Sequence, residues 1–207
     1  MVEVNPHDLL KINSVADLTS KNFPNWIKDI FPVSLTVVVR RSPIEDGLVP
    51  VGIRGIKREQ RFGTFIDEKK ILKVITPYDL VKESKWNRLS KERQELPAIK
   101  ALPKVAQILK DYEWGISGSV GFELATQTPA AKITSDLDLV WKPSSSISKD
   151  SAKILLQKLN QFGVHVDLQV IQAKNGFSLE EYINSSSTIM MKTLSGPILV
   201  RDPWIKI

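Results

Sequence analysis

Two aspartates separated by one residue stand in a short segment in which polar and apolar side chains alternate. The segment reads Asp136-Leu137-Asp138-Leu139-Val140. Because successive side chains of a β-strand point to opposite faces, a strand here presents both carboxylates on one face and both leucines to a core. Two carboxylates on a rigid strand are suitable ligands for a hard divalent cation such as Mg²⁺ or Mn²⁺. The pattern therefore predicts a strand over 137–141 with one buried and one acidic face.

A glycine turn and a helix are predicted upstream of this acidic strand. An apolar stretch over 114–117 ends at Gly118-Ser119, and residues 120–126 follow with helical character. Glycine lets the backbone approach a phosphate closely, and the serine hydroxyl and the N–H groups at a helix start can bind it. The order of glycine turn, helix and acidic strand is therefore suited to holding a triphosphate against a metal ion.

A third carboxylate, that of Asp167, is predicted on a neighbouring strand. Residues 164–170 alternate apolar side chains with His165, Asp167 and Gln169, which is typical of a half-buried strand. We expect Asp167 to hold a second metal ion that activates an attacking hydroxyl, or to act as a base toward it. Taken alone, each motif also has an ordinary explanation as a solvated strand end, a helix cap or an exposed carboxylate. Their order within one α/β unit favours a nucleotidyltransferase site.

Composition and charge narrow the classes of protein. Of the 207 residues, 42% are hydrophobic and 25% are charged, which is typical of a globular protein rather than a disordered one. The absence of cysteine excludes a disulfide framework and thiolate chemistry. The sequence has neither a signal-peptide pattern nor an apolar run of membrane-spanning length, so we expect a cytoplasmic protein. The net charge of +6 favours anionic partners such as nucleotides, nucleic acid or an acidic protein.

The predicted fold class is α/β or α+β, in two domains. A small N-terminal α/β domain is expected over 1–84, a charged connector over 85–100 and a catalytic domain over 101–207. In the first domain, β-branched residues predict a strand over 34–39, and turn residues then lead to a returning strand over 48–53. These two strands are expected to form a hairpin.

Basic residues gather where the returning strand meets a short amphipathic helix predicted over 57–66. They are Arg54, Lys57, Arg58 and Arg61, and Gly55 permits a tight turn among them. Guanidinium groups match phosphate oxygens, so the cluster is predicted to bind substrate phosphates or to dock an acidic protein. A solvated helix face explains the cluster equally well. Lys192, on a predicted C-terminal hairpin, is a further candidate for binding the substrate.

The central block of the sequence resembles a known family. Residues 114–126, followed by 135–139, are similar to the malonate decarboxylase holo-acyl-carrier-protein synthases, which are phosphoribosyl-dephospho-CoA transferases. Supporting matches lie at 7–10, 51–61, 196–197 and 202–204, so the resemblance spans nearly the whole chain. It implies a second domain similar to the polymerase-beta nucleotidyltransferases, with a mixed sheet. It also implies that the catalytic aspartate pair is Asp136 and Asp138.

The resemblance implies a reaction as well. The enzyme would transfer the prosthetic group of 2′-(5″-triphosphoribosyl)-3′-dephospho-CoA to a serine of the apo acyl carrier subunit of malonate decarboxylase, and pyrophosphate would leave. Two alternatives stay open. A nucleotidyltransferase that uses an ordinary nucleoside triphosphate on RNA or a small molecule would need the same site. A nucleic-acid-binding module would use the positive charge, but carboxylates in its groove would repel the phosphate backbone.

Overall fold

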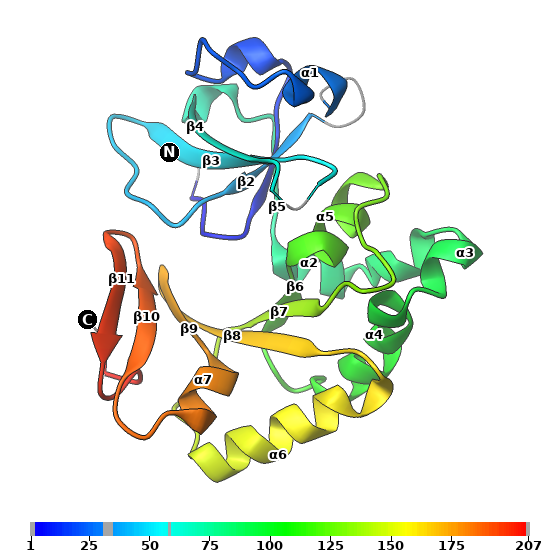
Figure 1. Ribbon diagram of the computed structural model, residues 1–207, viewed down its shortest axis with the longest axis vertical. Helices are drawn as coiled ribbons and strands as arrows, with labels where there is room; N and C mark the ends of the chain where they lie inside the picture. Colours follow the sequence, from blue (N-terminus) through cyan, green and yellow to red (C-terminus); the bar gives the residue numbers. More distant parts are fainter. Residues whose placement is uncertain (1–2, 31–34, 58, 206–207) are drawn as a thin grey trace. The chain divides into compact units, whose positions relative to one another are not determined.

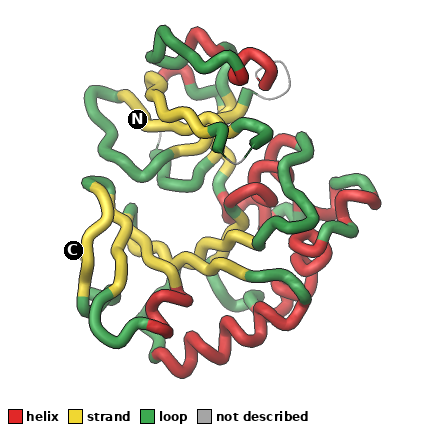
Figure 2. Tube along the Cα trace, in the orientation of Figure 1, coloured by secondary structure: helices red, strands yellow, loops and turns green. Residues whose placement is uncertain are grey.

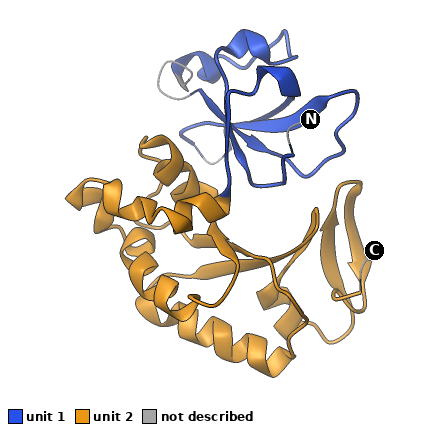
Figure 3. Ribbon diagram, turned by 180° about the vertical axis from the view of Figure 1, so that it is seen from behind, with its two compact units in different colours: residues 1–76 blue, residues 77–207 orange. Residues whose placement is uncertain are grey.

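The chain forms two compact units, residues 1–76 and 77–207, which are coloured blue and orange in Figure 3. The computed structural model describes residues 3–30, 35–57 and 59–205. The division falls earlier than the boundary expected near residue 84. Residues 85–100 belong to the second unit, where they form η3 (Lys85–Arg88), α3 (Lys91–Gln94) and the start of α4 (Pro97–Ile108). They do so because apolar side chains such as Trp86 and Ile99 are buried there.

Unit 1 is built around a five-stranded antiparallel sheet. The strands are β1 (Leu9–Lys11), β2 (Thr36–Val39), β3 (Leu48–Arg54), β4 (Arg61–Asp67) and β5 (Lys73–Ile75), in the order β4-β3-β2-β1-β5. The connections contain η1 (Val15–Asp17), α1 (Trp26–Ile30) and η2 (Glu68–Lys70), as Figure 1 shows.

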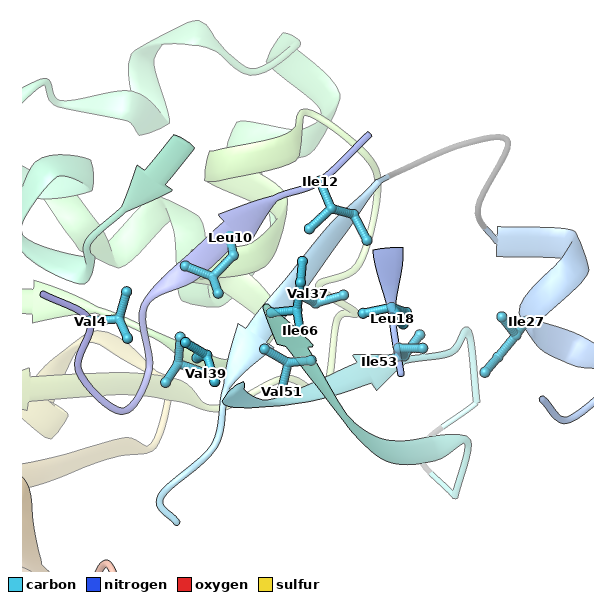
Figure 4. Packing of buried hydrophobic residues seen from close by; sticks show 11 residues of the cluster. Val4, Leu10, Ile12, Leu18, Ile27, Val37, Val39, Val51, Ile53 and Ile66 are labelled. Carbon is cyan, nitrogen blue, oxygen red and sulfur yellow. The ribbon is translucent and has the colours of Figure 1, made fainter. Parts of the chain in front are cut away.

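The core of unit 1 is a cluster of buried aliphatic side chains that includes residues from β1, β2, β3 and β4. Figure 4 shows Leu10 from β1, Val37 from β2, Val51 from β3 and Ile66 from β4 gathered in it. The predicted hairpin is confirmed, because β2 pairs with β3 in antiparallel fashion. Residue 34, the predicted start of its first strand, lies outside the described residues.

The helix predicted over 57–66 was wrong, because β4 occupies most of this segment. Along β4 the side chains alternate in burial, with Thr64 and Ile66 buried and Phe65 exposed between them. The strand pairs with β3 along its whole length. A short segment whose apolar residues fit a helical face can equally present alternate residues to a core, and pairing with an adjacent strand decides between the two.

Unit 2 contains a six-stranded mixed sheet. Its strands are β6 (Trp114–Ile116), β7 (Leu137–Trp141), β8 (Val166–Gln172), β9 (Asn175–Ser178), β10 (Ile189–Thr193) and β11 (Gly196–Val200), in the order β11-β10-β9-β8-β7-β6. β7 and β8 are parallel, and the other neighbours are antiparallel. The remaining helical segments are α2 (Pro77–Lys82), α5 (Gly118–Thr126), α6 (Lys149–Leu159), η4 (Asn160–Phe162) and α7 (Leu179–Asn184).

A sheet unit followed by a mixed-sheet unit with helices confirms the predicted α+β class. The crossover between the parallel strands is α6, the long helix that runs below the sheet in Figure 2 and contacts β8. Its buried residues include Leu155 and Leu159. Gly163 follows η4 with a φ of +75°, in the left-handed region that favours glycine. None of the helices among the described residues combines the length and the apolar character needed to cross a bilayer.

Side chains of β7 and β8 divide between the two faces of the sheet. Leu137, Leu139 and Val166 are almost completely buried in the core. The intervening residues Asp138 and Asp167 point to the opposite side and are only half-buried. We call this second side, defined by Asp138 and Asp167, the acidic face.

Candidate active site

Asp138 and Asp167 lie side by side on the acidic face. They are opposite each other in the parallel pairing of β7 with β8, so their Cα atoms are about 4.8 Å apart. Asp136 stands just before β7, and its side chain is 63% exposed. The structure therefore brings the acidic pair predicted from the sequence and the third predicted carboxylate together at the start of two parallel strands.

Gly118, the first residue of α5, lies directly against the carboxylate of Asp138. Its φ is +62°, and a Cβ atom built there would come within 1.8 Å of the Asp138 Oδ2 atom. The neighbouring Ser117 N–H donates to the Asp138 carbonyl at 2.9 Å. Only glycine satisfies both the backbone conformation and the close approach. The glycine predicted to admit a phosphate thus also seats the carboxylate of Asp138 at a helix N-terminus, where the helix dipole favours negative charge.

Ser119 holds the loop that precedes the acidic strand. Its side chain is buried, and its hydroxyl donates to the Ser135 Oγ atom at 3.3 Å. Ser135 Oγ in turn accepts the backbone N–H of Lys132 at 2.9 Å. Ser119 is therefore next to the site as predicted, but its hydroxyl is engaged within the protein. A direct contact of Ser119 with phosphate stays a prediction.

His165 lies between Asp136 and α7. Its Nδ1 atom lies 3.7 Å from the Asp136 Oδ1 atom, and its Nε2 atom lies 3.3 Å from the Glu180 Oε2 atom. All three side chains are about half exposed or more, so these contacts contribute little to stability. At 3.7 Å the contact with Asp136 is longer than a hydrogen bond, so His165 is a neighbour of this carboxylate and does not hold it in place.

An ion pair between Arg93 and the buried Glu123 connects two helices of unit 2 to the loop that leads to Asp136. The Arg93 Nε and Nη2 atoms donate to the two Glu123 carboxylate oxygens, each at 2.7 Å. Glu123 Oε2 also accepts the backbone N–H groups of Ala130 and Ala131, each at 2.8 Å, and Arg93 Nη2 donates to the Ala131 carbonyl at 2.7 Å. The pair therefore joins α3, α5 and the loop leading to Asp136.

The environment of this pair favours its ionised form. Burial by itself raises the pKa of Glu123, but the hydrogen bonds from Arg93, Ala130 and Ala131 outweigh burial and leave the pKa below its usual value. The same hydrogen bond raises the pKa of Arg93. Sequence reasoning missed both residues. Arg93 lies in the segment expected to be a connector, and an isolated glutamate in a helix gives no sign that it is buried.

Lys192 of β10 shares the acidic face with Asp167. Ile171 of β8 is opposite Gly176 of β9, and Gly176 is opposite Lys192. Residues that are opposite in a sheet point to the same side, and Ile171 points to the same side as Asp167. From the strand spacing and rise, Lys192 and Asp167 are about 16 Å apart at their Cα atoms. Lys192 thus lies on the same side of the sheet as Asp167 but well away from the carboxylates.

The basic cluster lies in unit 1, at the end of the β3–β4 hairpin where the loop connects the two strands. Arg54 and Arg61 are opposite each other, and the loop between them closes where the Gly55 N–H donates to the Gln60 carbonyl at 2.8 Å. Two guanidinium groups therefore start from one face of the hairpin, an arrangement that suits an anion. Arg58 lies outside the described residues.

The carboxylate oxygens at the acidic face are suitable ligands for a magnesium ion. Asp136 and Asp138 offer hard oxygen ligands, and Mg²⁺ commonly takes one or two carboxylates and completes its octahedron with water and substrate phosphates. Within residues 3–30, 35–57 and 59–205, no three acidic, histidine or cysteine side chains form a ready-made metal cage. A magnesium ion here would therefore take its remaining ligands from water and from the substrate.

Two family models together cover most of the chain. Residues 5–77 match the phosphoribosyl-dephospho-CoA transferase MdcG N-terminal domain, and residues 86–203 match the corresponding C-terminal domain. The site described above lies within the second match.

Curated relatives are similar over nearly their full length. The phosphoribosyl-dephospho-CoA transferase of Pseudomonas fluorescens strain Pf0-1 is 35% identical, over 96% of this chain and 93% of the relative. That of Pseudomonas syringae pv. tomato is 34% identical, over 96% and 92%. That of Klebsiella pneumoniae strain 342 is 30% identical, over 96% and 95%. No solved structure matches the chain significantly.

Proposed function

The chain belongs to the phosphoribosyl-dephospho-CoA transferase family, and on this premise we propose the donor, the acceptor and the residues of its transfer reaction. The donor is 2′-(5″-triphosphoribosyl)-3′-dephospho-CoA. The acceptor is a serine hydroxyl on the apo acyl carrier subunit of malonate decarboxylase. The reaction takes place in the cytoplasm and releases pyrophosphate.

One observation carries the assignment of the site. Asp138 and Asp167 are opposite each other on parallel strands, and Asp138 is seated against Gly118 at the start of α5. This arrangement concentrates negative charge beside a helix N-terminus, within the segment that matches the family's C-terminal domain. Such a site can bind a cation and a triphosphate together.

The transfer balances as a substitution at the α-phosphorus of the donor. The serine oxygen forms a bond to this phosphorus, and the bond from the phosphorus to the oxygen that bridges to the β-phosphate breaks. Pyrophosphate leaves with the electron pair, and the serine proton passes to the carboxylate of Asp167, which acts as the base. A phosphodiester then joins the carrier to the cofactor.

The other residues bind and orient the donor. Asp136 and Asp138 would hold Mg²⁺, which when bound neutralises charge on the triphosphate. The Arg93–Glu123 pair, through the N–H groups of Ala130 and Ala131, holds the loop that leads to Asp136. Arg54 and Arg61 bind phosphates of the donor, and Lys192 binds a part of the donor or carrier farther along the acidic face.

The carrier's mass tests this proposal. Purified protein is incubated with apo carrier subunit, donor and Mg²⁺, and the carrier is then weighed by mass spectrometry. We expect a gain equal to the phosphoribosyl-dephospho-CoA group, lost when the carrier serine is changed to alanine and when the metal is removed with EDTA. An unmodified carrier under full conditions, together with turnover of ATP or CTP on another acceptor, would contradict the proposed donor and acceptor.

A further inference from the structure

The sheet of unit 1 has an outer face, opposite the aliphatic core, with two glycines near its centre. Gly52 of β3 and Gly63 of β4 are opposite each other in the antiparallel pairing. Val51 and Ile53, the neighbours of Gly52, point into the core shown in Figure 4, so both glycines belong to the outer face. Neither glycine has a positive φ. What they provide is therefore space above the backbone, which we call the glycine gap.

Arg40, which follows β2, lies across the glycine gap. Its backbone N–H donates to the Pro50 carbonyl at 2.9 Å, and its Cγ and Cδ atoms lie 3.5 Å from the position of a Cβ atom added to Gly52. Its guanidinium group reaches Gly63, where an added Cβ atom would overlap the Nη1 atom. Arg40 is exposed, and within residues 3–30, 35–57 and 59–205 its guanidinium group forms no hydrogen bond or ion pair. The glycine gap thus orients a cation whose donors are all available.

Arg54 and Arg61 stand beside the glycine gap on the same outer face. Arg54 is two residues from Gly52 along β3, and Arg61 is two residues from Gly63 along β4, so each Cα atom is about 7 Å from that of the glycine. The Arg40 guanidinium group already lies at Gly63. The long side chains of the three arginines can therefore contact one ligand.

This end of the outer face is strongly basic. The one carboxylate within β3 and β4 is that of Asp67, at the other end of β4 from Arg61 and about 20 Å away. Its Oδ1 atom accepts the backbone N–H of Lys69 at 2.9 Å. Asp67 is too far away to neutralise the arginines. Guanidinium groups pair with phosphate oxygens through two parallel hydrogen bonds, so the favoured ligand is an anion with several phosphate oxygens.

The proposed donor contains two separate phosphate groups. One is the triphosphate, which needs a metal ion and is assigned to the acidic face. The other is the diphosphate bridge that joins the adenosine to the pantetheine, with one negative charge on each phosphate. Arginines can bind such a bridge directly and without a metal ion. An acidic face for one group and a basic face for the other match the charges of the donor.

We propose that Arg40, Arg54 and Arg61 form one phosphate site that binds the diphosphate bridge of the donor. The inference rests on the proposed function for the identity of the donor. It adds Arg40 as a residue that binds substrate and gives Gly63 the role of orienting it. Holding the bridge at a fixed place would position the donor for transfer without taking part in the chemistry.

Binding of dephospho-CoA, which has the bridge but lacks the triphosphate, tests the site apart from the reaction. Calorimetry on the full chain in EDTA would compare dephospho-CoA with adenosine and with pantetheine, which contain no phosphate. We expect dephospho-CoA to bind at least about tenfold more tightly than either. Arg40→Gln should weaken dephospho-CoA on the order of tenfold. Arg88→Gln makes the same change at an exposed arginine that pairs with Glu83 and should leave the affinity unchanged.

Two glycine variants test the orientation of Arg40 without changing any charge. Gly63→Ala places a methyl group on the Arg40 guanidinium group, whereas Gly52→Ala makes only an ordinary contact with the Arg40 stem. The end of the Arg40 side chain can move aside, so both variants should keep the wild-type unfolding temperature. Gly63→Ala should weaken dephospho-CoA by about threefold or more, and Gly52→Ala by less than about twofold.

Three results would overturn the inference. They are equal binding of dephospho-CoA and pantetheine, wild-type affinity in Arg40→Gln, and equal losses in the two glycine variants. Each of them would leave the proposed function standing if the carrier is still modified. Conversely, weakened dephospho-CoA binding in Arg40→Gln and Gly63→Ala, in a protein that modifies no carrier, would sustain the phosphate site and refute the proposed acceptor.

Discussion

Gly118 has both a backbone conformation and a contact with the Asp138 carboxylate that only glycine allows. Its positive φ and its contact with the Asp138 carboxylate both exclude a side chain. Gly163 has a similar φ of +75° but no heavy atom within 4 Å of the position of an added Cβ. The two glycines therefore separate the cost of backbone strain from the cost of displacing a carboxylate.

Replacing each of these glycines with alanine gives a matched pair of variants. Gly163→Ala should lower the free energy of unfolding by about 1 kcal/mol through strain alone. Gly118→Ala should lower it by about 2 kcal/mol or more and should also reduce the transfer rate, because the Asp138 carboxylate must move. Urea denaturation and the carrier assay measure the two effects. Equal losses of stability and activity in both variants would show that the contact with Asp138 is unimportant.

Glu123 should make stability depend on pH. Its folded-state pKa lies below the usual value of 4.5, so its carboxylate contributes stability above that pH, and the contribution is lost as the pH falls through the folded-state value. Glu123→Gln should lower the free energy of unfolding at pH 7 by about 3 kcal/mol, because Arg93 loses its charged partner. The difference between wild type and variant should shrink on acidification.

A matched control for Glu123 is Glu95, which pairs with Lys100 on the surface, where the two side chains are 69% and 65% exposed. Glu95→Gln should change stability by less than about 1 kcal/mol at any pH. A wild-type-to-variant difference for Glu123 that stays constant from pH 7 to pH 3 would contradict the ionised pair.

At the scale of elements, α6 determines how β7 and β8 come to be parallel. A parallel pair requires a crossover, and α6 provides it by burying one side against the sheet. Leu159→Ala, at a fully buried position, should destabilise the protein by about 3 kcal/mol. Ile154→Ala, at a position of the same helix that is 52% exposed, should cost less than about 1 kcal/mol. Thermal or urea unfolding of the two variants decides whether α6 is held as described.

The elements nearest the site were the ones best predicted from the sequence, because their signals are local. Alternation located β7 and β8, and a glycine followed by a short apolar run located α5. The β4 segment was misread as a helix because its strand character depends on pairing with β3. β9 was missed because Asn175 and Gly176 have low strand propensity. They form a strand because they pair with β8 on one side and β10 on the other.

At the level of the whole molecule, contacts that join distant segments could not be predicted from the sequence. The Arg93–Glu123 pair joins α3 to α5, and a pocket of about 410 Å³ is lined by residues from 142–146, 171–175 and Trp204. No periodicity links such residues, so neither could be derived from a single sequence. The family resemblance predicted the family itself, which the matches over both units confirm.

Arg54 and Arg61 of unit 1 contribute to the net charge of +6, which favours anionic ligands. If these guanidinium groups bind phosphates of the donor, Arg54→Ala should raise the KM for the donor on the order of tenfold and change kcat little. Arg88→Ala removes an exposed arginine that pairs with Glu83 and should leave both constants unchanged. Steady-state kinetics with varied donor measure this, and an unchanged KM in Arg54→Ala would remove the phosphate-binding role.

The rate of pyrophosphate release in the presence of donor, Mg²⁺ and apo carrier tests most directly whether the acidic face carries out the transfer. Asp138→Asn keeps the shape of the side chain and removes the charge beside Gly118, whereas Asp150→Asn makes the same change at an exposed position of α6. We predict that Asp138→Asn lowers the rate by at least about a hundredfold while Asp150→Asn keeps the wild-type rate. A wild-type rate in Asp138→Asn would contradict the assignment of transfer to the acidic face.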